Sequence, residues 1–105
     1  MPRDVDHVIE QVTQRLPGAV VAQIEPTHTS DDVGLWWFSL PGVAPRIQIE
    51  SSTGACPFLV ESDEQSSTEA LRAGTINETV KFIVDYLVAA SEGRSLRLHG
   101  ELYWK

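Results

Sequence analysis

Several features that mark common classes of small protein are missing from this 105-residue chain. No apolar run approaches the roughly 20 residues needed to cross a bilayer. The first residues contain acids where a signal peptide would carry a basic segment followed by an apolar one. The single cysteine, Cys56, cannot form an intramolecular disulfide, so nothing indicates an oxidising compartment. Together these absences predict a soluble protein of the cytoplasm.

Sequence motifs for metal and cofactor binding are also missing. The chain has no HExxH, no CxxC pair, no EF-hand pattern and no GxGxxG or GxxxxGK phosphate loop. His28, Asp31 and Asp32 share one polar loop, but zinc sites usually need three or four converging ligands. We therefore predict no metal site and no cofactor.

Basic residues are scarce in the middle of the chain. With 8 Lys+Arg against 15 Asp+Glu, the net charge is −7 at neutral pH. Residues 25–69 contain eight acids and one base, Arg46, so this segment accounts for the whole excess. An acidic surface repels phosphate groups, which argues against binding to nucleic acid or to an anionic membrane. Its natural complement is a basic protein surface, although a charge of this size also serves solubility alone.

The chain does contain enough apolar sequence, 42% of its residues, for one domain with its own core. Two stretches have the 3.6-residue period of an amphipathic helix. The first covers residues 4–16, with Asp4 as the expected N-cap and a stop at Pro17-Gly18. The second covers residues 76–92; a capping box from Thr75 to Glu78 opens it and Gly93 ends it.

Five short segments have the composition or the alternation of β-strands: residues 19–24, 33–40, 46–50, 57–62 and 96–104. Pro41 and Gly42 occupy the central positions of a type II turn between the second and third segments. The polar residues 62–74 are expected to form a loop. The sequence therefore predicts a single α+β domain over residues 1–105, of order α-β-β-β-β-α-β, with an antiparallel sheet and both helices packed on one face of it.

An aromatic run, Trp36-Trp37-Phe38, lies in the second predicted strand. Successive side chains on a strand point to opposite faces, so Trp36 and Trp37 cannot both lie under one layer of helices. Exposed aromatics are enriched where proteins bind partners, whereas a loop or the last strand could also cover them. We predict a partner-binding surface with aromatic anchors and an acidic rim, and the sequence leaves open which of Trp36 and Trp37 belongs to it. Its candidate residues are Trp36, Trp37, Phe38, Trp104, Asp31, Asp32, Glu61, Asp63 and Glu64.

Cys56 is a candidate nucleophile. A reactive cysteine needs a histidine, a base or a helix N-terminus to stabilise its thiolate. The three histidines, His7, His28 and His99, lie on different predicted elements, and acids near Cys56 would raise its thiol pKa. We therefore expect Cys56 to act as a small apolar side chain rather than in catalysis.

The passages GLWWFSLPG, RIQIESSTGACPFLVE and TINETVKFIVDYL, within residues 34–87, resemble a family of small bacterial proteins that has no assigned activity. More loosely, the chain resembles the immunity proteins of bacterial toxin systems, which are small, acidic, cytoplasmic and not catalytic. It also resembles the acidic chaperones of type III secretion. These likenesses imply a protein partner, and they carry over no functional residue.

The sequence as a whole favours a non-enzymatic protein-binding domain. Its most concrete form is an immunity-type inhibitor that masks a basic surface of its partner. A homodimer joined through the same aromatic side, or a secretion-chaperone-like protein, is the structural alternative. A small enzyme that uses Cys56, or the loop of His28, Asp31 and Asp32, is the catalytic alternative.

Overall fold

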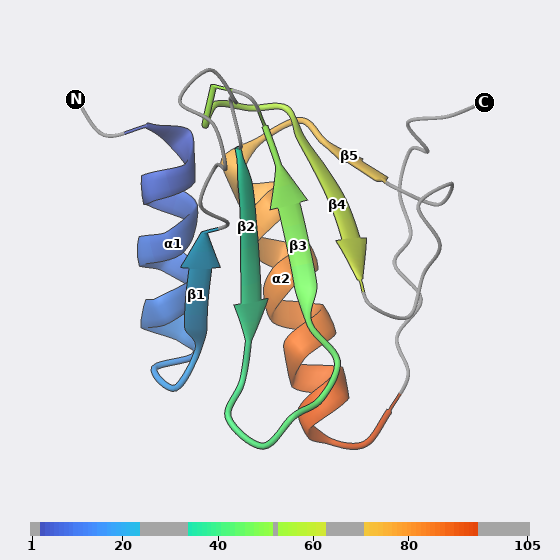
Figure 1. Ribbon diagram of the computed structural model, residues 1–105. Coiled ribbons are helices and arrows are strands. Elements are labelled where there is room, and N and C mark those ends of the chain that lie inside the picture. Colours follow the sequence, from blue (N-terminus) through green and yellow to red (C-terminus); the bar gives the residue numbers. More distant parts are fainter. Residues whose placement is uncertain (1–2, 24–33, 52, 63–70, 95–105) are drawn as a thin grey trace.

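The computed structural model arranges its helices and strands in the order α1-β1-β2-β3-β4-β5-α2 (Figure 1). It describes residues 3–23, 34–51, 53–62 and 71–94, so the strand predicted over residues 96–104 lies outside the described residues. The helices and strands are α1 (Asp4–Arg15), β1 (Val20–Gln23), β2 (Leu35–Ser39), β3 (Ile47–Glu50), β4 (Phe58–Ser62), β5 (Leu71–Ala73) and α2 (Ile76–Ser91).

The five strands form one antiparallel sheet in which spatial order follows sequence order. Both helices lie on the same side of this sheet and pack against each other (Figure 1). The predicted α+β class, the antiparallel sheet and the single layer of helices are confirmed.

Strand β5 corrects the sequence prediction, which assigned residues 62–74 to a loop. Leu71 and Ala73 are buried, while Arg72 between them is exposed. Three residues of alternation are too few to stand out in a polar stretch of sequence. The strand forms because pairing with β4 places Leu71 beside Val60 and Ala73 beside Phe58 in the core.

The ends of α2 follow the sequence prediction. Thr75 is the N-cap, and its Oγ1 accepts a hydrogen bond from the backbone N–H of Glu78 at 3.1 Å. At the other end Gly93 has a φ of 74° and donates its N–H to the carbonyl of Ala90. A left-handed residue at this position satisfies carbonyls that the last helical turn leaves unpaired. The N-cap Thr75 and the left-handed Gly93 are confirmed. Of the predicted capping box the structure shows the Thr75 half, and the Glu78 carboxylate accepts a hydrogen bond from the Thr75 hydroxyl at 3.4 Å.

The start of α1 differs from the prediction by one residue and by one contact. Arg3 occupies the N-cap position, and the Asp6 carboxylate accepts its backbone N–H at 2.8 Å. Asp4, which the sequence predicts as the cap, is the first helical residue. Its Oδ2 accepts a hydrogen bond from the backbone N–H of Cys56 at 2.8 Å. Asp4 therefore ties α1 to the loop between β3 and β4, a contact that joins residues 52 positions apart.

The core lies between the helices and the inner face of the sheet, which we define as the face turned toward α1 and α2. On β2, Trp36 and Phe38 point inward, with 3% and 0% of their surfaces exposed. The other core side chains come from both helices and from β3, β4 and β5: Val5, Val8, Val12, Ile47, Ile49, Phe58, Val60, Leu71, Ala73, Val80, Ile83, Tyr86 and Leu87. Burial of this apolar stripe, more than the caps, stabilises helices of this length.

The turn between β2 and β3 is the predicted type II turn. The N–H of Val43 donates to the carbonyl of Leu40 at 3.0 Å, and Gly42 has a φ of 76°. The third position of such a turn requires a positive φ, which glycine adopts without strain. The two strands that follow from this reversal pair with Phe38 beside Ile47 on the inner face.

Candidate functional site

The outer face of the sheet, opposite the helices, is the surface on which we predict partner binding. Its side chains follow from the alternation along each strand and from the register between strands: Val20, Ala22, Leu35, Trp37, Ser39, Gln48, Glu50, Leu59, Glu61 and Arg72. In the part of the chain that the structure describes, no helix or strand covers this face (Figure 1). The outer face thus mixes apolar and charged side chains, whereas the described side chains of the inner face are apolar apart from Ser62 on β4.

Trp37 is the large aromatic side chain of the outer face. It is half-buried and stands between Ala22 of β1 and Gln48 of β3. The guanidinium of Arg46 lies 4.3 Å from the centroid of a Trp37 ring, which makes a cation–π contact. This contact restricts the indole, so less conformational freedom would be lost when a partner covers it.

Two acids of the outer face, Glu50 and Glu61, lie on the neighbouring strands β3 and β4. Gln48 stands directly opposite Glu61, and its Nε2 donates a hydrogen bond to Glu61 Oε2 at 3.2 Å. Partial burial, and then the charge of Glu50, raise the pKa of Glu61. Both causes make the ionised form of Glu61 less favourable, and a cation placed between the two carboxylates would offset them.

The structure divides the residues of the predicted surface into three groups. Trp36 and Phe38 lie in the core beneath the helices, which corrects the predicted surface, because neither side chain is available to a partner. Trp37 and Glu61 lie on the outer face, separated by Gln48. His28, which belongs to the loop of the catalytic alternative, lies outside the described residues. So do the remaining members of the predicted surface: Asp31, Asp32, Asp63, Glu64 and Trp104.

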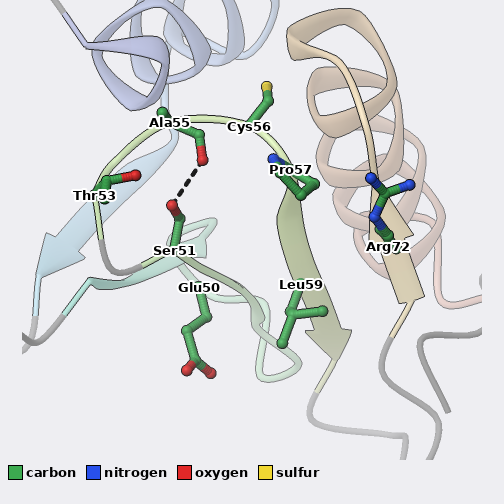
Figure 2. Close-up of a pocket in the computed structure, with 8 residues that line it drawn as sticks. All are labelled: Glu50, Ser51, Thr53, Ala55, Cys56, Pro57, Leu59 and Arg72. Carbon is green, nitrogen blue, oxygen red and sulfur yellow. Dashed lines mark hydrogen bonds between the residues drawn. The ribbon is translucent and has the colours of Figure 1, made fainter.

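Cys56 lies in the loop between β3 and β4 and is partly buried. Burial and the Asp4 carboxylate raise the pKa of its thiol, with a smaller contribution from Glu78. Figure 2 shows the sulfur directed away from Ser51 and Glu50. Because a raised pKa keeps the sulfur protonated at neutral pH, this environment favours an unreactive thiol.

A pocket of about 340 Å³ lies where this loop meets the outer face (Figure 2). It is lined by Glu50, Ser51, Thr53, Ala55, Cys56, Pro57, Leu59 and Arg72. Glu50, Leu59 and Arg72 stand in one row across β3, β4 and β5, so an acid and a base flank an apolar side chain. Sequence reasoning missed this pocket because it depends on the pairing of three strands, one of which was predicted as a loop.

Gly54 holds the same loop against the first turn of α1. Its φ is 74°, and a Cβ atom there would lie 3.0 Å from Arg3 Cδ and 3.3 Å from Val5 Cγ1. Its carbonyl accepts the backbone N–H of Val5 at 2.9 Å. Gly54 donates its N–H to the carbonyl of Ser51 at 3.3 Å. The positive φ and the close approach to α1 both favour glycine at this position.

The described residues contain no group of three His, Cys, Asp or Glu side chains that could hold a metal ion. Among the helices that the structure describes, none is long and apolar enough to span a bilayer. The outer face and its adjoining pocket are therefore the candidate site on geometry alone. Comparison of the chain with protein-family models, curated proteins and solved structures finds no match.

Proposed function

We propose that this chain is a non-enzymatic protein-binding domain whose outer face binds and masks a basic surface of a partner protein, as an immunity-type inhibitor does. One observation carries the proposal. Trp37, restrained by Arg46, shares with the acids Glu50 and Glu61 a sheet face that no described element covers. Interfaces commonly combine a central aromatic anchor with a charged surround in this way.

The two parts of this surface would contribute differently to binding. Covering Trp37 removes apolar area from water and supplies affinity, mainly by slowing dissociation. The acids act at a distance, because the net charge of −7 attracts a basic partner and speeds its approach. A partner cation near Glu50 and Glu61 would also reduce the repulsion that raises the pKa of Glu61.

The experiment uses the wild-type chain as bait in lysate of the source organism, followed by measurement of Kd with the purified partner. Trp37→Ala should weaken binding by about 30-fold, the size expected for removal of a central anchor. Raising the salt from about 50 to about 500 mM should weaken it by roughly tenfold, because attraction between separated charges is screened. Asn77→Ala changes an exposed residue of α2 on the helical side and should leave the Kd unchanged.

The proposal is wrong if binding is insensitive to salt and survives Trp37→Ala. Circular dichroism of each variant establishes that the fold is retained before affinities are compared. Gel filtration of the chain alone tests the homodimer alternative. A stable dimer that Trp37→Ala converts to monomer would show that the outer face joins two copies and does not bind a different protein.

A further inference from the structure

A second surface lies at the edge of the sheet. Strand β1 pairs with β2 on one side, and within residues 3–23, 34–51, 53–62 and 71–94 no strand pairs with its other side. In an antiparallel sheet every second residue of an edge strand turns its N–H and C=O groups outward. Such a row of donors and acceptors is the hydrogen-bonding complement of an extended strand.

The residues of β1 do not protect this edge. Residues 16–24 include no charged residue, and β1 itself contains no proline. Val20 has 50% of its surface exposed, a high value for a large apolar side chain, and Ala22 is exposed on the same face. Sheet edges that must stay unpaired usually carry a charge, a proline or a bulge. The edge of β1 is thus suited to pairing.

The position of α1 decides which kind of strand can pair with β1. Figure 1 shows α1 in the helical layer, displaced past β1 on the side away from β2. If two copies paired symmetrically through β1, their β1 strands would lie about 4.8 Å apart. Because α1 is displaced past β1 toward the second copy, the two α1 helices would approach each other as closely as the strands do, whereas packed helices need about 8–10 Å between their axes. The two copies of α1 would therefore compete for the same space. An extended segment without its own flanking helix avoids this conflict.

We propose that β1 accepts an extended segment of a partner protein as an added strand. The segment would carry apolar side chains at alternate positions, turned toward α1, because the helical layer continues beside this edge. It would carry basic residues, because the chain has a net charge of −7. These residues would lie at the ends of the segment, because β1 itself has no charged side chain to pair with them. The added strand would bind backbone groups at the edge of β1, whereas the outer face binds through side chains centred on Trp37, so either proposal can fail alone even though Val20 and Ala22 adjoin both surfaces.

The probe is the synthetic peptide acetyl-Lys-Thr-Val-Thr-Val-Thr-Lys-amide, titrated into the isotope-labelled full chain and followed by NMR. The amide signals of Val20, Val21 and Ala22 should shift with saturable binding. A control peptide of the same side chains, N-methylated at both valines and the central threonine, lacks the central donors of both edges. It should bind roughly tenfold more weakly, the loss expected for one or two hydrogen bonds.

Two variants of the protein test whether the peptide binds at β1 or at the acids of the outer face. Val20→Lys adds a positive charge at an exposed position of β1 and should weaken binding of the basic peptide by about threefold at low salt. Glu61→Gln alters the outer face on β4 and should leave the peptide affinity unchanged.

Three results would overturn the proposal. The first is equal affinity of the chain for the two peptides. The second is a change in the amide signals that does not saturate up to about 1 mM peptide, since a Kd above that value is too weak to support the proposal. The third is self-association of the chain through β1 without peptide, which would make a second copy the occupant.

Discussion

Trp36 and Trp37 are neighbours in the sequence, yet the fold gives them opposite environments. Trp36 points to the inner face and is 3% exposed, with the Arg3 guanidinium 5.8 Å from its ring centroid at the edge of the core. Trp37 points to the outer face, where it is half-buried and has Arg46 at 4.3 Å. Strand alternation alone separates them. One indole therefore serves the packing of the helices, and the other remains at the surface proposed for a partner.

The two faces of the sheet differ in chemistry in the same way. Apart from Ser62, the described side chains of the inner face are apolar and meet those of α1 and α2 in one core. The outer face places Gln48, Glu50 and Glu61 beside Leu59 and Trp37, and one of its acids has a raised pKa. Such a face adds less to the free energy of unfolding than an equal area of core. Changes on the two faces should therefore have separable effects on stability and binding.

The largest expected effect compares the two indoles directly. Trp36→Ala should lower the free energy of unfolding by about 3–5 kcal/mol, because it leaves a cavity among packed side chains. Trp37→Ala should lower it by about 1–2 kcal/mol, the value of partial burial and one cation–π contact. Urea denaturation followed by circular dichroism measures both. Equal losses would mean that the outer face is as much a part of the core as the inner one.

Gly42 and Gly54 have nearly equal positive φ angles but different surroundings, so they compare a loop packed against α1 with an exposed turn. Gly54 lies against Arg3 and Val5, whereas a Cβ atom on Gly42 would meet nothing within 4 Å. Gly42→Ala should cost about 1 kcal/mol for the left-handed backbone alone. Gly54→Ala should cost about 2–4 kcal/mol, because the new methyl also crowds the side chains of Arg3 and the buried Val5. Thermal unfolding of the two variants tests the difference, and similar losses would show that the loop can move away from α1 freely.

The parts of the fold that the sequence predicted are those set by local interactions. The cap at Thr75, the left-handed Gly93 and the turn at Pro41-Gly42 each depend on a few adjacent residues. The helical stripe and the strand alternation depend on segments of about ten residues. All of these features can be predicted from residue propensities and from the periodicity of apolar side chains.

The parts that the sequence did not predict depend on contacts between distant segments. Strand β5 exists because β4 offers it a partner, and Asp4 accepts the N–H of Cys56 across 52 positions. Alternation showed that Trp36 and Trp37 lie on opposite faces, but only the packing of α1 and α2 decides which one is inside. The pocket beside Leu59 follows from the same long-range pairing. Local patterns carry no information about these contacts.

Cys56 lies at the boundary between the helical layer and the pocket, and its reactivity tests the catalytic alternative. Burial and Asp4 raise the pKa of its thiol, so iodoacetamide at about pH 8 should modify it more slowly than free N-acetylcysteine. Asp4→Asn keeps an oxygen that can accept the N–H of Cys56 but removes the charge. It should speed the reaction roughly twofold to fivefold. A wild-type rate above that of N-acetylcysteine would contradict this and revive an enzymatic role for Cys56.

The smallest expected effect concerns Glu61 on the outer face. Its pKa is raised in the folded chain, so folding favours the protonated form, and the stability this contributes is lost as the pH rises through the folded-state pKa. Glu61→Gln keeps an acceptor for Gln48 and does not ionise. Relative to wild type, it should gain a few tenths of a kcal/mol in free energy of unfolding between about pH 4 and pH 7.

Urea titrations of both proteins at the two pH values measure this change, and Glu10→Gln on the exposed side of α1 controls for the loss of one negative charge. A relative loss of stability at neutral pH would show that the Glu61 carboxylate stabilises the fold as an ion. The Glu61 carboxylate would then need no cation from a partner to offset its charge. A gain would instead mean that an acid on the outer face is kept at a cost to stability, as is common for residues that serve binding.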